Sequence, residues 1–229
     1  MSKIKNLIVL FILVIIPAAI MIWHRNHDTS GFASKELILY PLLFGGGSII
    51  LLILLKRYFL KEPLEDFNSG TGFLIKDFMW GLVLTVIYFA LFYLERMTLM
   101  GVLEFKSNDE LLSLMLDMRE KPVLVLLWFL PVLWVGIALY EELIRVFMLT
   151  SLWSFSKNGI WTIVVISLTS VLVGVTHWSQ GSYGIVTIAI KSLVACFFFY
   201  KYRRLMPLVI AHALYDGIQV AMLLITYPR

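Results

Sequence analysis

The chain contains seven apolar stretches that are each long enough, or nearly so, to cross a lipid bilayer as a helix. A bilayer-crossing helix needs about 20 mostly apolar residues, with about 17–25 as the working range. The stretches lie at residues 7–23, 37–55, 73–94, 122–153, 160–177, 183–200 and 205–226. The sequence therefore predicts an all-α fold, a polytopic transmembrane helical bundle of about seven spans, with eight as the alternative count.

Composition agrees with a membrane protein and excludes several other classes. Hydrophobic residues make up 60% of the chain and charged residues 15%, whereas a soluble domain has about 45–50% and about 25%. The mean hydropathy is +0.89. So few charges cannot cover a water-facing surface of this size. Disordered, collagen-like and coiled-coil chains are excluded, and a soluble enzyme nearly so.

The distribution of charge predicts an orientation in the membrane. Lys and Arg outnumber Asp and Glu by 19 to 15, an excess typical of cytoplasmic loops rather than of nucleic-acid binding. Basic residues in the short loops favour an amino terminus inside and a carboxyl terminus outside. We expect a multi-pass protein of a bacterial plasma membrane, in contact with the lipid bilayer and with no nucleic-acid partner. Its single cysteine, Cys196, gives no evidence of an oxidising compartment.

Changes in polarity along the chain predict three parts. Residues 1–100 form the amino-terminal transmembrane helices, 101–121 a polar connector, and 122–229 a helical core that carries the candidate site. The connector fits two descriptions equally well, an amphipathic helix lying on the bilayer or a solvated helix. The stretch 122–153 would be about 48 Å long as a helix, so it must tilt, kink near Pro131 or project from the bilayer.

Seven ionisable residues fall well inside the proposed spans. Each charged one costs roughly 2.5–3.5 kcal/mol at the centre of a membrane helix on insertion scales. Scattered over lipid-facing positions they would be hard to tolerate, so we expect them to converge on an internal, partly hydrated cavity. They are Glu141, Glu142, Arg145, His177, Lys191, His212 and Asp216.

Two of the proposed spans carry charged pairs at helical spacing. Glu141 and Arg145 share a helix face, and the adjacent Glu142 adds a second carboxylate that repels the first in a low dielectric. His212 and Asp216 repeat the four-residue spacing, so the carboxylate can orient the imidazole. Each pair alone is also explained as an ion pair or polar pair that stabilises a buried helix.

His177 and Lys191 complete the set. His177 stands beside Trp178 at a helix end, a place typical of membrane-interface residues. With the other residues it supplies a base, two imidazoles and a cation for an oxyanion, which together can activate water against an amide. Lys191 does not fit this chemistry, and we interpret it as structural, either snorkelling or neutralising an acid.

The three patterns resemble the motifs of the CPBP family of intramembrane proteases (CAAX protease and bacteriocin-processing, also called Abi). The family's motifs are E-E-x-x-x-R, F-x-x-x-H and H-x-x-x-N or D, in this order on successive helices. Here they read EELIR at 141–145, VGVTH at 173–177 and HALYD at 212–216. The resemblance covers about residues 136–220. The chain departs from it at Val173, Val146 and Asp216, where relatives commonly have Phe, a small residue and Asn.

The resemblance implies an intramembrane endopeptidase, CAAX-protease-like and suited to peptide or bacteriocin processing, acting on a membrane-associated peptide or protein. In this scheme Glu141 and His177 activate water, His212 and Asp216 stabilise the tetrahedral intermediate, and Arg145 positions Glu141 and Glu142. The family is often described as metalloproteases, and Glu141, His177 and His212 can form a His₂Glu zinc set. The same residues can also polarise water without metal. The expected cofactor is therefore either Zn²⁺ or none.

The alternative function is a non-proteolytic immunity protein or small transporter that uses the same polar cavity. Buried Glu, His, Asp and Lys also describe proton relays. The sequence shows no inverted repeat and no matched pair of broken helices, which argues against a transporter. A purely structural anchor leaves the interior charges unexplained, so the protease is the preferred prediction.

Overall fold

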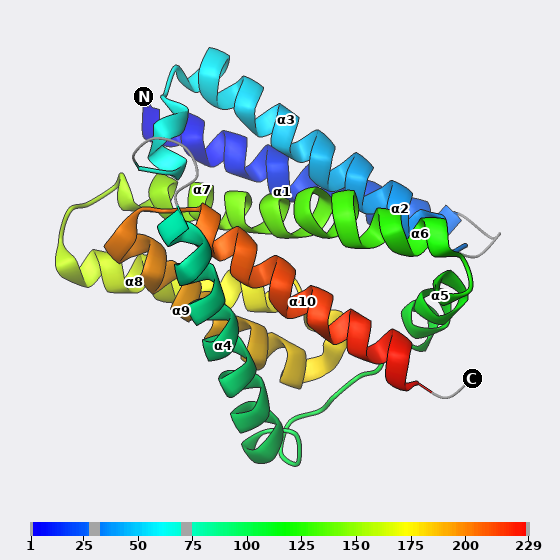
Figure 1. The fold of residues 1–229 in the computed structure, drawn as a ribbon. Coiled ribbons are helices and arrows are strands. Elements are labelled where there is room, and N and C mark those ends of the chain that lie inside the picture. Colours follow the sequence, from blue (N-terminus) through cyan, green and yellow to red (C-terminus); the bar gives the residue numbers. More distant parts are fainter. Residues whose placement is uncertain (1, 28–32, 70–74, 228–229) are drawn as a thin grey trace. The chain divides into compact units, whose positions relative to one another are not determined.

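The computed structural model describes residues 2–27, 33–69 and 75–227 (Figure 1). These residues are 85% helical and form no strand, which confirms the all-α prediction. The α-helices are α1 (Ser2–His27), α2 (Glu36–Tyr40), α3 (Gly47–Leu54), α4 (Ile75–Thr98), α5 (Asp109–Arg119), α6 (Pro122–Leu127), α7 (Tyr140–Trp153), α8 (Gly159–Val175), α9 (Gly181–Tyr202) and α10 (Met206–Thr226). Wider, π-type turns form η1 (Pro41–Gly46), η2 (Leu55–Leu60) and η4 (Trp128–Leu139), and short 3₁₀ turns form η3 (Leu64–Phe67) and η5 (Trp178–Gln180).

Five helical stretches among the described residues are long and apolar enough to cross a membrane. They are Glu36–Leu60, Ile75–Thr98, Pro122–Trp153, Trp178–Tyr202 and Met206–Thr226. They coincide with five of the seven expected spans, although residues 73 and 74 of the third expected span lie outside the described residues. The expected span at 160–177 corresponds to the shorter apolar helix α8, and the one at 7–23 lies within α1. The chain is a multi-pass membrane protein.

The long fourth stretch is one continuous helical segment of 32 residues. Its middle third, η4, has wide helical turns, and Pro131 lies inside it. Proline lacks an N–H and its ring clashes with the carbonyl four residues earlier. A wider turn relieves that clash and lets the neighbouring backbone groups find other partners. The irregularity expected at Pro131 is therefore a widening of the helix rather than a break.

The chain divides into two compact units. Unit 1 comprises residues 1–64, 110–144 and 216–229, and unit 2 comprises 65–109 and 145–215. Two of the four boundaries fall inside α7 and inside α10, so both of these helices contribute to both units.

In unit 1, η1 and η4 pack with their backbones in close contact at glycines. A Cβ atom built on Gly45 would lie 2.1 Å from the carbonyl oxygen of Gly136, and one built on Gly136 would lie 2.8 Å from the carbonyl carbon of Pro41. By contrast, Gly46 and Gly47 have open space where a Cβ would stand. Close packing of this kind is what small residues provide in membrane helices.

Unit 2 is built around the antiparallel hairpin of α8 and α9, which α4 and α10 accompany. A Cβ on Gly174 of α8 would lie 2.4 Å from the carbonyl oxygen of Ile185 on α9. A Cβ on Gly81 of α4 would lie 2.5 Å from Ile210 Cγ2 on α10. The start of α10 is capped by Asn68, whose Oδ1 accepts hydrogen bonds from two backbone N–H groups, the first that of Leu205 at 3.0 Å.

The polar connector contains one helix, α5. Two of its methionines, Met115 and Met118, are buried, whereas Leu111 is exposed. At the end of α5, Lys121 donates a hydrogen bond of 2.6 Å to Asp117 and another of 2.9 Å to Ser34. The short helix expected in this segment is present, and its placement at the bilayer surface stays a prediction.

Candidate active site

The first motif stands at the start of α7, directly after the widened turns of η4. Glu142 and Arg145 are 1% and 6% exposed, and Glu141 is half-buried. Helical spacing puts Arg145 on the face of Glu141, four residues away, and within reach of Glu142, three residues away. A buried guanidinium and a buried carboxylate are tolerated only where opposite charge or hydrogen bonds compensate them. Wide helical turns beside such a segment are frequent at functional sites.

The third motif lies within α10. His212 is the seventh residue of this helix and is half-buried, as is Asp216 one turn later. Tyr215 between them is buried and packs its ring against Tyr88 and Phe89 of α4, with centroids 5.9 and 5.0 Å apart. The aromatic contact fixes this turn of α10 within unit 2.

The second motif ends just beyond α8, where His177 follows the last helical turn. Its Nδ1 lies 3.0 Å from the carbonyl oxygen of Val173 and 3.2 Å from Thr176 Oγ1. A carbonyl oxygen can only accept a hydrogen bond, so the contact with Val173 requires the proton on Nδ1. Neutral His177 then keeps its lone pair on Nε2. This is the tautomer needed for a general base or a metal ligand at Nε2.

The six candidate residues divide between the two units. Glu141, Glu142 and Asp216 belong to unit 1, and Arg145, His177 and His212 belong to unit 2. Within unit 2, the polar contacts of His177 end at Val173 and Thr176, and none reaches His212 or Arg145. Each of the other five candidates takes part in at least one polar, ionic or ring contact.

A metal centre is not assembled among the described residues. They contain no group of three or more His, Cys, Asp or Glu side chains that could hold a metal ion. The zinc set implied for Glu141, His177 and His212 draws on residues of both units, and its use stays a prediction.

Lys191 has a partner that the sequence did not identify. Its ammonium group on α9 forms an ion pair with Glu95 on α4, and both side chains are buried. The expected span at 73–94 stops one residue before Glu95. The structure includes it in the last turn of α4, which ends at Thr98. Of the two interpretations of Lys191, neutralisation of an acid is confirmed.

The part of the chain that carries the three motifs matches a known protease family. Residues 123–218 match the sequence model of the Rce1-like family, described as type II CAAX prenyl endopeptidase Rce1-like. This segment is thus similar to the Rce1-like proteases, which confirms the predicted resemblance to CPBP intramembrane proteases. All six candidate residues lie within the matched segment. No curated protein and no solved structure matches the chain.

Proposed function

We propose that this protein is an intramembrane endopeptidase whose water-activating groups are the carboxylates of α7 and the histidines that follow α8 and lie within α10. The observation that carries the proposal is the burial of Glu142 and Arg145 inside an apolar helix of the Rce1-like segment. Charged residues at such positions are costly and are typically functional. The family itself supports CAAX-protease-type hydrolysis in general.

The chemical roles follow from the protonation each group can hold. Glu141, with Glu142 one residue away in a low-dielectric helix, is suited to accept a proton from water. His177, with its proton fixed on Nδ1 by Val173, offers Nε2 as a second acceptor. His212, oriented by Asp216 one turn away, can donate to the oxyanion of the tetrahedral intermediate. Arg145 balances the charge of the two glutamates.

The substrate proposed is a membrane-associated peptide or protein, and the setting is a bacterial plasma membrane with the amino terminus of the chain inside. Residues 122–229 would form the catalytic core, residues 1–100 the accompanying helices and 101–121 the connector. Peptide or bacteriocin processing is the proposed class of reaction. Support for the location comes from the excess of basic residues in short loops.

A comparison of membrane peptides identifies the substrate and tests the proposal. Membranes that contain the wild-type chain or its Glu141→Gln variant are compared by mass spectrometry. Glu104→Gln is the matched control, since Glu104 is an exposed acid outside the proposed site. A cleaved peptide pair found with the wild type and with Glu104→Gln, and missing with Glu141→Gln, supports the protease. The same peptides in all three membranes would favour the immunity or transport alternative.

Metal dependence separates the two forms of the mechanism. A strong chelator that abolishes cleavage, followed by recovery with Zn²⁺, would support a His₂Glu set that forms with substrate. Cleavage that persists in a metal-free preparation would support water activation by glutamate and histidine alone.

A further inference from the structure

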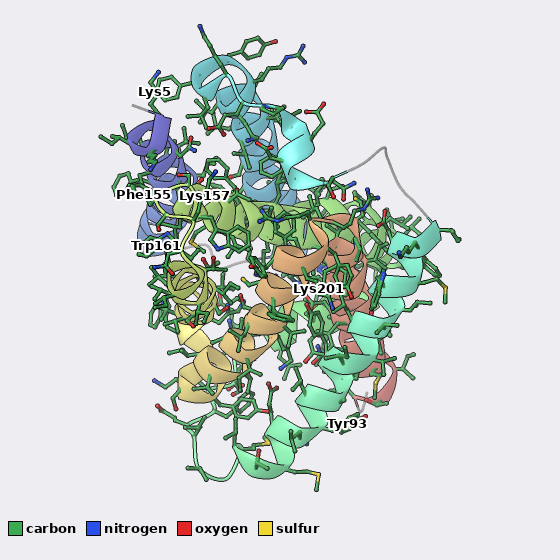
Figure 2. The ribbon with its side chains drawn as sticks, turned by 90° about the vertical axis from the view of Figure 1, so that its left-hand side faces the viewer. Lys5, Tyr93, Phe155, Lys157, Trp161 and Lys201 are labelled. Carbon is green, nitrogen blue, oxygen red and sulfur yellow. The ribbon has the colours of Figure 1, made fainter. Side chains whose placement is uncertain are left out.

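One end of unit 2 carries a set of cations that the proposed protease does not use. We propose that Arg203, together with Lys201 and Lys157, forms a binding site for the phosphate headgroup of an anionic phospholipid. The three residues lie at the turn between α7 and α8 and at the end of α9. In Figure 2, Phe155, Lys157 and Trp161 lie together at the first of these turns, and Lys201 lies at the end of α9.

Arg203 has an unusual backbone conformation for a residue with a side chain. It follows the last residue of α9 with φ 53° and ψ 36°, and its N–H closes the helix by donating to Phe199 at 2.8 Å. Glycine is the usual residue at this position, because the left-handed conformation costs other residues roughly 1–2 kcal/mol. The presence of arginine in this strained conformation indicates that its side chain has a function.

The guanidinium group of Arg203 is held on an aromatic platform. Its Cζ lies 4.5 Å from the ring centroid of Trp153, 5.9 Å from that of Phe199 and 6.0 Å from that of Tyr200. Trp153 and Tyr200 also pack on each other, with centroids 5.4 Å apart. Stacking fixes the plane of a guanidinium and leaves its N–H edge able to bind a phosphate through two parallel hydrogen bonds.

The next residue, Arg204, differs from Arg203 because its guanidinium group is paired within the protein. Arg204 donates to both carboxylate oxygens of Asp77 and to the carbonyl oxygen of Ser69. Arg203, by contrast, forms no ion pair with any described residue, and neither do Lys201 and Lys157. The charge of these three residues is therefore available to a partner.

The charges of unit 2 are distributed unequally between its two ends. The end with Arg203 has the cations Lys76, Lys157, Lys201 and Arg203 against the acids Glu65 and Asp66, leaving aside the Arg204–Asp77 pair. The other end, leaving aside the Lys191–Glu95 pair, has two residues of each sign, namely Arg96, Lys106, Glu104 and Asp109. An anionic ligand is therefore attracted to the first end only.

Apolar surface continues from these cations along the helices, which favours a lipid over a soluble anion. Phe197 is 58% exposed and stands one turn before Lys201 on the same face of α9. Ile160 and Ile163 are 71% and 66% exposed at the start of α8, just after Lys157. A phospholipid would place its phosphate among the cations and its acyl chains on these side chains. Basic and aromatic residues together at helix ends are typical of the headgroup layer.

The test measures lipid retention by the full-length protein, purified in mild detergent with equal amounts of phosphatidylglycerol and phosphatidylcholine. Native mass spectrometry counts the bound molecules of each lipid. We expect a preference for phosphatidylglycerol, and a decrease of about fivefold in that preference for Arg203→Gln, the effect of removing one surface cation. Lys106→Gln removes a cation from the other end and should leave the preference unchanged.

Arg203→Gly is a second test variant, which is measured in the same way in case Arg203→Gln folds poorly. Glycine suits the left-handed conformation, so this variant should keep its helical circular dichroism and lose the lipid preference as Arg203→Gln does. Equal retention of phosphatidylglycerol by the wild type and Arg203→Gly would overturn the proposal. So would displacement of the lipid by soluble glycerol phosphate at similar concentration, or an equal loss in Lys106→Gln.

Discussion

Lys191 on α9 and Glu95 on α4 form a buried ion pair, although they are 96 positions apart in the sequence. The ammonium group also lies 5.8 Å from the ring centroid of Tyr215. Tyr215 stands between His212 and Asp216 on α10, so the pair contacts the turn that carries the third motif. Burial of both charges makes each partner depend on the other. The pair therefore fixes the positions of α4 and α9 beside this part of α10.

Removal of one partner should destabilise the fold strongly. Lys191→Met leaves the carboxylate of Glu95 buried without its cation, and loss of one member of a buried pair typically costs about 3–5 kcal/mol. Thermal unfolding in detergent, followed by circular dichroism, should show a clear decrease in Tm. Turnover of the folded fraction should stay within about tenfold of the wild type, about 1.4 kcal/mol in the barrier, because Lys191 has no role in the proposed chemistry.

The double variant Glu95→Gln with Lys191→Met is the matched control for this prediction. It removes both charges at once, so most of the stability lost in Lys191→Met should return. A single variant as stable as the wild type would show that the pair does not hold α4 and α9 together.

Two adjacent glycines of unit 1 should respond in opposite ways to the same substitution. Gly45→Ala would place a methyl group 2.1 Å from the Gly136 carbonyl oxygen and force the two backbones apart. We expect a loss of about 1–3 kcal/mol, typical of overpacking. Gly46→Ala meets open space inside a helix and should be neutral or stabilising by about 0.5–1 kcal/mol. Equal effects on Tm would contradict the close contact of η1 and η4.

In unit 2, we expect a comparable loss of stability from Gly181→Ala. Its φ of 78° with ψ of −175° is accessible almost only to glycine, and an added Cβ would lie 2.4 Å from the carbonyl oxygen of Glu104. That oxygen accepts a hydrogen bond of 3.0 Å from the N–H of Tyr183. Gly181→Ala should cost about 2 kcal/mol or more. Gly159→Ala, with open space at the start of α8, should leave Tm nearly unchanged.

Arg145 should be needed for both stability and activity. Arg145→Met leaves two glutamates of α7 without the cation on their own helix, in a low dielectric. We expect a lower Tm by circular dichroism and little turnover. Arg145→Lys retains the charge and should recover more stability than turnover, because an ammonium group lacks the planar fork of a guanidinium. A fully active, stable Arg145→Met variant would exclude a role for this side chain.

Hydropathy alone was sufficient for the general fold, because lipid requires long helices with internally paired backbones. Five expected spans match apolar helices, with their ends differing by about five residues at most. The sequence also predicted the irregularity of the long helix at Pro131. The partner of Lys191 could not be predicted, because a contact between α4 and α9 leaves no short-range pattern in the sequence. The expected span at 73–94 ended before Glu95 for a related reason, since a hydropathy window ends a span at the first charge even when the helix continues.

The sequence supplies the candidate site as a set of residues, which stays a prediction, and does not supply its geometry. Spacing along α7 and α10 shows which side chains share a face. It does not show which nitrogen of His177 is free, which depends on the contact of Nδ1 with the Val173 carbonyl. The use of Arg203 was also hidden, because its left-handed conformation and aromatic platform appear only in three dimensions.

The most direct test of the central claim is the turnover of Glu141→Gln, measured with purified protein on a peptide that spans the cleavage site. Glutamine keeps the volume and hydrogen-bonding shape of the side chain and removes the base. We expect at least about a 10²-fold decrease in turnover, with Tm equal to or above that of the wild type, because a half-buried carboxylate next to the buried Glu142 is costly. Cleavage at the wild-type rate by a folded Glu141→Gln protein would contradict the assignment of Glu141 as the catalytic base.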